Sequence, residues 1–206
     1  MIVLYSGTPG SGKSLHLAKV IKFWVHDKKA PCIGNFDFNS LEVKPRGYGG
    51  YLLVNNSKLT PDFLINFSDY YCKVRKWRRV PEEHILLVID ECQLLYNARE
   101  WNKGDRAGWI SFFTQHRKLG YHVILVAQFN QMIDKQVRAL LEYELVHRKV
   151  KNIGWWGNVL NFVALGGLHV CVKIYSPLNT KVGTEFFKAD KRLFALYDSY
   201  TRFDST

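Results

Sequence analysis

The sequence reads Gly7-Thr8-Pro9-Gly10-Ser11-Gly12-Lys13-Ser14 directly after a short apolar run, Ile2-Val3-Leu4-Tyr5. The octet matches every fixed position of the pattern G-x-x-x-x-G-K-[ST], and apolar residues at helical spacing follow it. The backbone N–H groups of such a glycine-rich turn can point inward around phosphate oxygens, and the next helix adds the positive end of its dipole. The stretch therefore predicts a strand, a phosphate-binding loop and a helix, in that order. The alternative is a Gly/Ser/Pro turn that happens to contain a lysine.

Two side chains at the end of the octet have specific expected roles. Lys13 would reach the β- and γ-phosphates of a nucleotide, and the Ser14 hydroxyl would be a ligand of Mg²⁺. The residues expected to bind the nucleotide are Gly7, Thr8, Pro9, Gly10, Ser11, Gly12, Lys13, Ser14 and Leu15.

A second candidate motif is an apolar run followed by two acids, Ile85-Leu86-Leu87-Val88-Ile89-Asp90-Glu91. Such a run is typical of a strand buried on both faces of a parallel sheet, and ligands bind at the carboxyl ends of these strands. We expect Asp90 to hold Mg²⁺ through water, and Glu91 to orient and activate the attacking water. The alternative is a strand end that carries two surface acids.

Two further stretches bear on which nucleotide binds. Gln128 follows the apolar run 122–127, where it would be placed to sense the γ-phosphate; an ordinary strand cap is the alternative. Residues 102–105 read Asn-Lys-Gly-Asp, which matches the N-K-x-D guanine-recognition pattern. No predicted strand precedes them, and Glu91-Cys92-Gln93 follows Asp90 where a GTPase needs D-x-x-G. We interpret 102–105 as a turn and expect ATP, with Mg²⁺, as the cofactor.

Length and charge narrow the class of protein. The chain has 206 residues, 47% of them hydrophobic, which is enough for one sizeable core. Lys and Arg outnumber Asp and Glu by 29 to 18, and the net charge of +11 favours an anionic partner such as nucleic acid, nucleotide or membrane lipid. The four cysteines show no C-x-x-C spacing, so we expect buried thiols in a reducing compartment, without a disulfide frame or zinc site. We read the N-terminal apolar run as a strand and not as a signal peptide.

Two basic stretches and one uncharged stretch allow two interpretations each. Residues 73–79, which surround Trp77, and residues 147–151 read first as solvated ends of elements, with contact to nucleic-acid phosphates as the alternative. Residues 152–172 are uncharged and long enough to span a bilayer. They also contain asparagines and glycines, and both flanks are positive, so we expect strands joined by an apolar loop.

Alternating strand and helix patterns predict an α/β fold with a mainly parallel central sheet flanked by helices. Together with the phosphate loop, this predicts a P-loop NTPase of the RecA-like or ASCE type, with a small β extension near the C-terminus. We expect residues 1–150 to form the ATPase core, and residues 151–206 to form a C-terminal β extension and a tail packed on it.

The chain resembles the zonula occludens toxin (Zot) family. Beside the phosphate loop, the resemblance is carried by Asp90-Glu91-Cys92-Gln93, by His116-Arg117-Lys118-Leu119-Gly120 with Leu125-Val126-Ala127-Gln128, and by the tail 185–200. It covers nearly the whole chain. It implies an ATPase on the cytoplasmic face of the host inner membrane that helps to assemble filamentous phages and to export their DNA through the envelope.

The implied mechanism is Mg²⁺-dependent hydrolysis of ATP in a homo-oligomeric ring, in which an arginine of one subunit completes the site of the next. Arg117, Arg138 and Arg99 are the candidates for that arginine. Candidate partners are phage DNA or a DNA–coat complex, the host inner membrane and envelope channel proteins. Two alternatives stay open: a nucleotide or small-molecule kinase, and a nucleic-acid- or membrane-binding module whose nucleotide site is only structural.

Overall fold

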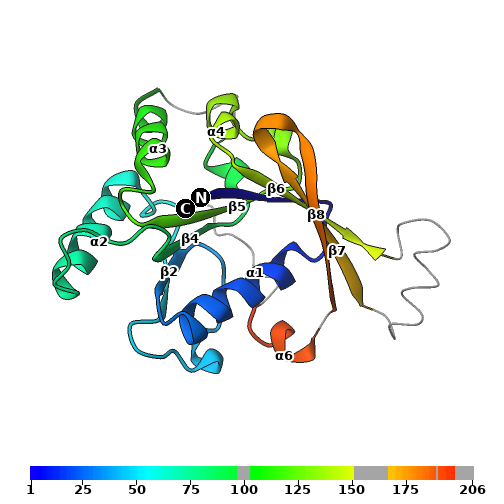
Figure 1. Ribbon diagram of the computed structural model, residues 1–206, viewed down its shortest axis with the longest axis horizontal. Helices are drawn as coiled ribbons and strands as arrows, with labels where there is room; N and C mark the ends of the chain where they lie inside the picture. Colours follow the sequence, from blue (N-terminus) through cyan, green and yellow to red (C-terminus); the bar gives the residue numbers. More distant parts are fainter. Residues whose placement is uncertain (97–102, 151–166, 189, 198–206) are drawn as a thin grey trace.

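A computed structural model describes residues 1–96, 103–150, 167–188 and 190–197 (Figure 1). The strands are β1 Ile2–Ser6, β2 Pro31–Gly34, β3 Gly50–Leu53, β4 Ile85–Ile89, β5 Tyr121–Val126, β6 Tyr143–Lys149, β7 Leu168–Tyr175 and β8 Thr180–Lys188. The α-helices are α1 Lys13–Lys22, α2 Pro61–Val74, α3 Lys103–Gln115, α4 Lys135–Ala139 and α6 Lys191–Phe194. Short 3₁₀ segments are η2 Ser40–Val43, η3 Cys92–Leu94, η4 Asn130–Met132 and η6 Ser176–Leu178, and α1 continues into a π-helical turn, η1 Phe23–Asp27.

All eight of these strands belong to one sheet, in the order β3-β2-β4-β5-β1-β6-β7-β8. The pairings from β3 to β6 are parallel, and β7 and β8 continue the sheet as antiparallel strands. Strand β5 therefore lies between β1, which precedes the phosphate loop, and β4, which ends at the acid pair. The C-terminal β extension that we predicted is thus part of the same sheet, and it extends to one side of the helical layers in Figure 1.

Helices cover both faces of the sheet, which explains why β1, β4 and β5 are buried along their whole length. Alternate residues of β4 pack in opposite directions, with Ile85, Leu87 and Ile89 in one core and Leu86 and Val88 in the other. The first core includes side chains of α2, α3 and α4, and the second includes side chains of α1. Figure 1 shows α2, α3 and α4 on one side of the sheet and α1 and α6 on the other.

Two helices differ from the sequence-based expectation. The sequence predicts a helix over 108–119, closed by Gly120, but α3 spans Lys103–Gln115, so residues 103–105 of the N-K-x-D match lie in a helix and not in a turn. Residue 102 lies outside the described residues. We expected a helix over residues 134–142, but α4 ends at Ala139, because the chain must turn before β6 starts at Tyr143. Its N-terminus is capped as a helix start should be, since the Asp134 carboxylate accepts a hydrogen bond from the Gln136 N–H at 2.7 Å.

The basic stretch 73–79 makes contacts within the protein. The Arg75 guanidinium lies over the rings of Tyr48 and Trp77, at 3.9 and 4.4 Å from their centroids. The Trp77 ring also meets the His84 ring edge to face at 4.9 Å. Most of the uncharged stretch 152–172 lies outside the described residues, and its end forms the start of β7. Among the helices that the structure describes, none has the length and apolarity to cross a bilayer.

Candidate active site

The phosphate-binding loop joins the carboxyl end of β1 to the first turn of α1, as predicted. Gly7 and Gly12 have φ angles of 140° and 99°, which residues with a Cβ rarely adopt. A Cβ at Gly7 would lie 2.5 Å from the His147 carbonyl oxygen, and one at Gly12 would lie 2.6 Å from the His169 imidazole. The loop is therefore fitted closely against β6 and β7. Because α1 begins at Lys13, its unpaired N–H groups face the loop and favour an anion there.

Lys13 is buried and folds back over the loop. Its ammonium donates hydrogen bonds to the carbonyl oxygens of Gly7 at 2.6 Å and of Thr8 at 3.3 Å. Burial lowers the pKa of this ammonium, while the negative charges of Glu91 and Asp90 act in the opposite direction. The charge of Lys13 thus interacts with both acids across the width of β5. Ser14, in the first turn of α1, is half-buried beside it.

The acid pair stands at the end of β4, as predicted. Burial raises the pKa of the Asp90 carboxyl to about 6, the nearby Glu91 adds to this, and the Glu91 N–H and Lys13 oppose it. A cation beside Asp90 would favour its charged form. Glu91 adopts a left-handed conformation, with φ of 45°, and its carboxylate accepts a hydrogen bond from the Gln93 side chain. Both carboxylates are therefore held at the sheet edge by local contacts.

Asn35 fixes the position of Asp90, and the sequence did not reveal this residue. It follows β2, the neighbour of β4, and is buried. Its side-chain oxygen accepts from the Asp90 N–H at 2.6 Å, and its amide nitrogen donates to the Asp90 carbonyl at 2.9 Å. The same amide nitrogen donates to Asn56 at 2.7 Å. One side chain thus satisfies both backbone groups of the residue that we expect to hold Mg²⁺.

We predict that Asn35→Ala lowers the free energy of unfolding by about 2–3 kcal/mol, because it leaves two backbone groups of Asp90 without a partner. For a chain of this size the melting temperature should fall by about 5–10 °C. The matched control is Asn56→Ala, which removes one half-buried side-chain partner and should cost less than about half as much. Thermal unfolding followed by circular dichroism measures both. Equal losses for the two variants would contradict the role of Asn35.

Gln128 lies between the loop and the acids, at the end of β5. Its carbonyl oxygen accepts the Gly7 N–H at 3.1 Å, so the backbone of Gln128 is tied to the start of the loop. The register pairs Tyr5 with Val126 and Ile89 with Leu125, which brings the ends of the three strands to the same edge. A phosphate bound in the loop would therefore have Gln128 beside it and Glu91 one strand further on.

Of the three candidate arginines, Arg117 lies away from the phosphate-binding loop of its own chain. The Arg117 guanidinium is 55% exposed and donates to the Glu142 carboxylate at 3.0 Å. Glu142 also approaches the N-terminal amine, so Arg117 lies at the amino end of β1, the end opposite to the loop. Arg138 is half-buried on α4. Arg99 lies outside the described residues.

A cavity of about 470 Å³ opens beside the loop, between the ends of β5 and β6. Its lining includes Gly7, Thr8, Gln128, Phe129, Glu144 and Lys149. Lys149, at the end of β6, reaches over the loop, since its Nζ would lie 3.4 Å from a Cβ placed on Gly10. His169 of β7 faces the loop from the same side, with its Nδ1 2.9 Å from the Ser11 carbonyl oxygen. From the sequence, 147–151 was interpreted only as a basic stretch. Its approach to the loop could not be predicted, because no local sequence pattern links β6 to residues 7–14.

The fold and this site define a P-loop NTPase. Solved structures of similar fold include an ATPase domain, with a TM-score of 0.60 and 10% identity over 96% of this chain and 84% of that one. Another is the N-terminal domain of zonular occludens toxin from Neisseria meningitidis, with a TM-score of 0.56 and 15% identity over 96% of this chain and 98% of that one. The predicted fold class is confirmed.

The particular family is given by the sequence: the family model for zonular occludens toxin (Zot) matches residues 1–203, so the chain belongs to this family. The resemblance inferred from the motifs is thus confirmed. Relatives include the gene 1 proteins of Enterobacteria phages fd and M13, each 33% identical over 129 residues. The match covers 58% of this chain and 37% of each of those proteins, so the chain corresponds to a minor part of their length.

Proposed function

We propose that this chain binds MgATP in the loop at residues 7–14 and hydrolyses it to drive filamentous phage assembly and DNA export. The observation that carries the proposal is the arrangement at one sheet edge: Lys13 in the loop, Gln128 on the strand between, and Asp90 with Glu91 on the strand beyond. These groups would contact the phosphates, sense the γ-phosphate, hold the metal and activate water. The phage origin of the relatives supports the assembly role.

The residues that would hold Mg²⁺ suit that ion. Ser14 offers a hydroxyl oxygen and Asp90 a carboxylate, and hard oxygen donors are the ligands that Mg²⁺ prefers. Burial raises the pKa of the Asp90 carboxyl, and a bound cation would stabilise its charged form. Bound Mg²⁺ supplies charge neutralisation at the β- and γ-phosphates. The protein's own contribution is to orient: Asn35 fixes the backbone of Asp90, and Gln93 holds the carboxylate of Glu91.

Two further cations belong to this proposal. Lys149, over the loop at Gly10, would contact the phosphates from the side of β6. Arg117 lies at the opposite end of β1 from the loop of its own chain, so as an arginine finger it would serve the site of an adjacent subunit in a ring. Arg138, on the short helix before β6, is the second candidate for the arginine finger.

Such a ring would work at the cytoplasmic face of the host inner membrane, with phage DNA and envelope channel proteins as partners.

We expect the purified chain with MgATP to release inorganic phosphate, and we expect ATP to be used in preference to GTP. Hydrolysis in ¹⁸O-labelled water should place the label in the released phosphate, because Glu91 is expected to activate water as the acceptor. The assay is run over a range of protein concentrations, since a ring completes each site only when subunits associate. Transfer of the γ-phosphate to a nucleoside monophosphate, without labelled phosphate, would contradict hydrolysis and indicate a kinase.

A further inference from the structure

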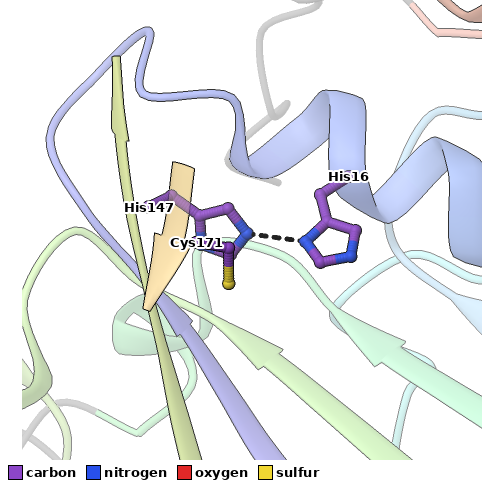
Figure 2. A group of neighbouring side chains, drawn as sticks. All are labelled: His16, His147 and Cys171. Atoms are coloured by element: carbon purple, nitrogen blue, oxygen red, sulfur yellow. Dashed lines mark hydrogen bonds between the residues drawn. The ribbon is translucent and has the colours of Figure 1, made fainter. Parts of the chain in front are cut away.

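Three potential metal ligands meet directly behind the phosphate loop. They are His16 of α1, His147 of β6 and Cys171 of β7, and Figure 2 shows the two imidazoles facing each other, with Cys171 beside the His147 ring. One ligand atom from each lies within 4.8 Å of the other two. The side chains are closed off from solvent, with exposed fractions of 5% for His16 and 1% each for His147 and Cys171. Two imidazoles and a thiol therefore lie close together where water does not reach them.

The hydrogen bonds of His147 direct a lone pair into the group. Its Nδ1 faces the carbonyl oxygens of Leu145 at 2.9 Å and Ser6 at 3.3 Å. Both are acceptors, so we assign the ring proton to Nδ1, which leaves Nε2 as the bare nitrogen. This Nε2 lies 2.9 Å from Nδ1 of His16 (Figure 2). Metal-binding histidines are oriented in the same way: the ring nitrogen that does not bind the metal donates its N–H to an acceptor such as a backbone carbonyl.

The surroundings keep the two imidazoles neutral, which is the form that binds metals. The Tyr5 ring lies 5.0 Å from the His16 ring and 4.9 Å from the His147 ring, and Phe187 packs on His16 at 5.0 Å. Burial lowers the pKa of His16 to about 4, and burial with the neighbouring His16 lowers the pKa of His147 to about 3. Neutral imidazoles can act as ligands directly, whereas burial raises the pKa of the Cys171 thiol to about 12, so the bound ion itself would have to stabilise the thiolate.

We propose that His16, His147 and Cys171 bind a Zn²⁺ ion. Two imidazole nitrogens and one thiolate form a donor set that Zn²⁺ prefers. With three protein ligands, a water molecule would take the fourth position. Binding displaces one proton from the Cys171 thiol to solvent, and His16 moves its ring proton from Nδ1 to Nε2. Zn–N bonds of about 2.0–2.1 Å and a Zn–S bond of about 2.3 Å require the two rings to separate slightly and the thiol to move inward.

The consequence is a link between the loop and the C-terminal strands. His16 lies three residues after Lys13 on α1. His147 lies on β6, and its backbone carbonyl oxygen packs closely against Gly7 of the loop. A metal held by these ligands would fasten the first turns of α1 to β6 and β7. The cysteine spacing gave no indication of a zinc site, because the ligands at positions 16, 147 and 171 meet only through the pairing of β6 with β7 and the packing of α1.

The decisive test needs no variant. The full chain is stripped with a chelator, loaded with Zn²⁺, freed of excess metal by gel filtration, and examined by zinc X-ray absorption. We expect about one zinc per chain, with a single sulfur at about 2.3 Å and two imidazoles at about 2.0–2.1 Å. Zinc at one hundred times its dissociation constant should raise the melting temperature by about 5–10 °C. A spectrum without a sulfur neighbour, or no retained zinc, would overturn the proposal.

A matched pair of variants assigns the sulfur. Cys171→Ala removes the proposed ligand, and Cys32→Ala removes another fully buried strand cysteine, on β2. We expect Cys32→Ala to retain one zinc per chain and its thermal shift, and Cys171→Ala to lose both. Equal zinc retention by the two variants would show that Cys171 is not a ligand. If Cys171→Ala does not fold, the X-ray absorption spectrum of zinc-loaded Cys32→Ala is the test. A sulfur neighbour of zinc in that spectrum supports the assignment of Cys171, and the loss of the sulfur neighbour overturns it.

Discussion

Lys13→Ala is expected to lower ATP turnover by on the order of a hundredfold or more and to weaken ATP binding, because Lys13 is the ammonium buried within the phosphate loop. Its charge interacts with Glu91 and Asp90, and its ammonium donates hydrogen bonds to the carbonyl oxygens of Gly7 and Thr8. A γ-phosphate would replace those carbonyls as its partner. Phosphate release and a nucleotide titration measure the two effects.

The matched comparison is Lys149→Ala. This lysine also reaches the loop, but it is half-exposed, so water screens its charge more than that of the buried Lys13. We expect its loss to weaken ATP binding by about tenfold or less. Thermal unfolding of both variants confirms that they are folded. Turnover by Lys13→Ala within about threefold of the unchanged protein would contradict the proposed role of the loop.

The two nucleotide motifs could be predicted from the sequence because the residues of each motif are close together along the chain. The loop needs its glycines and lysine within eight positions, and the run 85–89 is apolar because helices cover both faces of β4. The apolar run 122–127 places Gln128 at the end of a strand, but its position between the loop and the acids depends on the strand order β4-β5-β1. The fold class followed from the alternation of such runs with helical patterns, and the neighbouring structures confirm it.

The rest of the site depends on which strands become neighbours, and no local pattern specifies this. Asn35 matters because β2 lies beside β4, and Lys149 and His169 reach the loop because β6 pairs with β1 and β7 pairs with β6. His169 lies 158 residues from the loop carbonyl that it contacts. The start of α3 at Lys103 was not predicted, because a glycine at 108 lowers helix propensity without ending a helix.

Glu91→Gln is expected to separate ATP binding from hydrolysis. The amide has nearly the shape of the carboxylate and can still accept the hydrogen bond from Gln93, so the left-handed turn at this position should be kept. It cannot take a proton from water at neutral pH. We expect the rate of the chemical step to fall by about 10²–10⁴-fold, while the affinity for MgATP changes by less than about threefold.

A single-turnover experiment with labelled ATP measures this separation, because it follows the chemical step without product release. The control is Glu82→Gln, an exposed acid in the turn before β4, which should leave both quantities unchanged. Asp90→Asn provides the contrast, since it should weaken the dependence on Mg²⁺ and not only the chemical step. If Glu91→Gln hydrolyses ATP at the unchanged rate, then another group activates the water. Because β5, which Gln128 follows, lies between β4 and β1, Gln128 would then be the next residue to test for orienting that water.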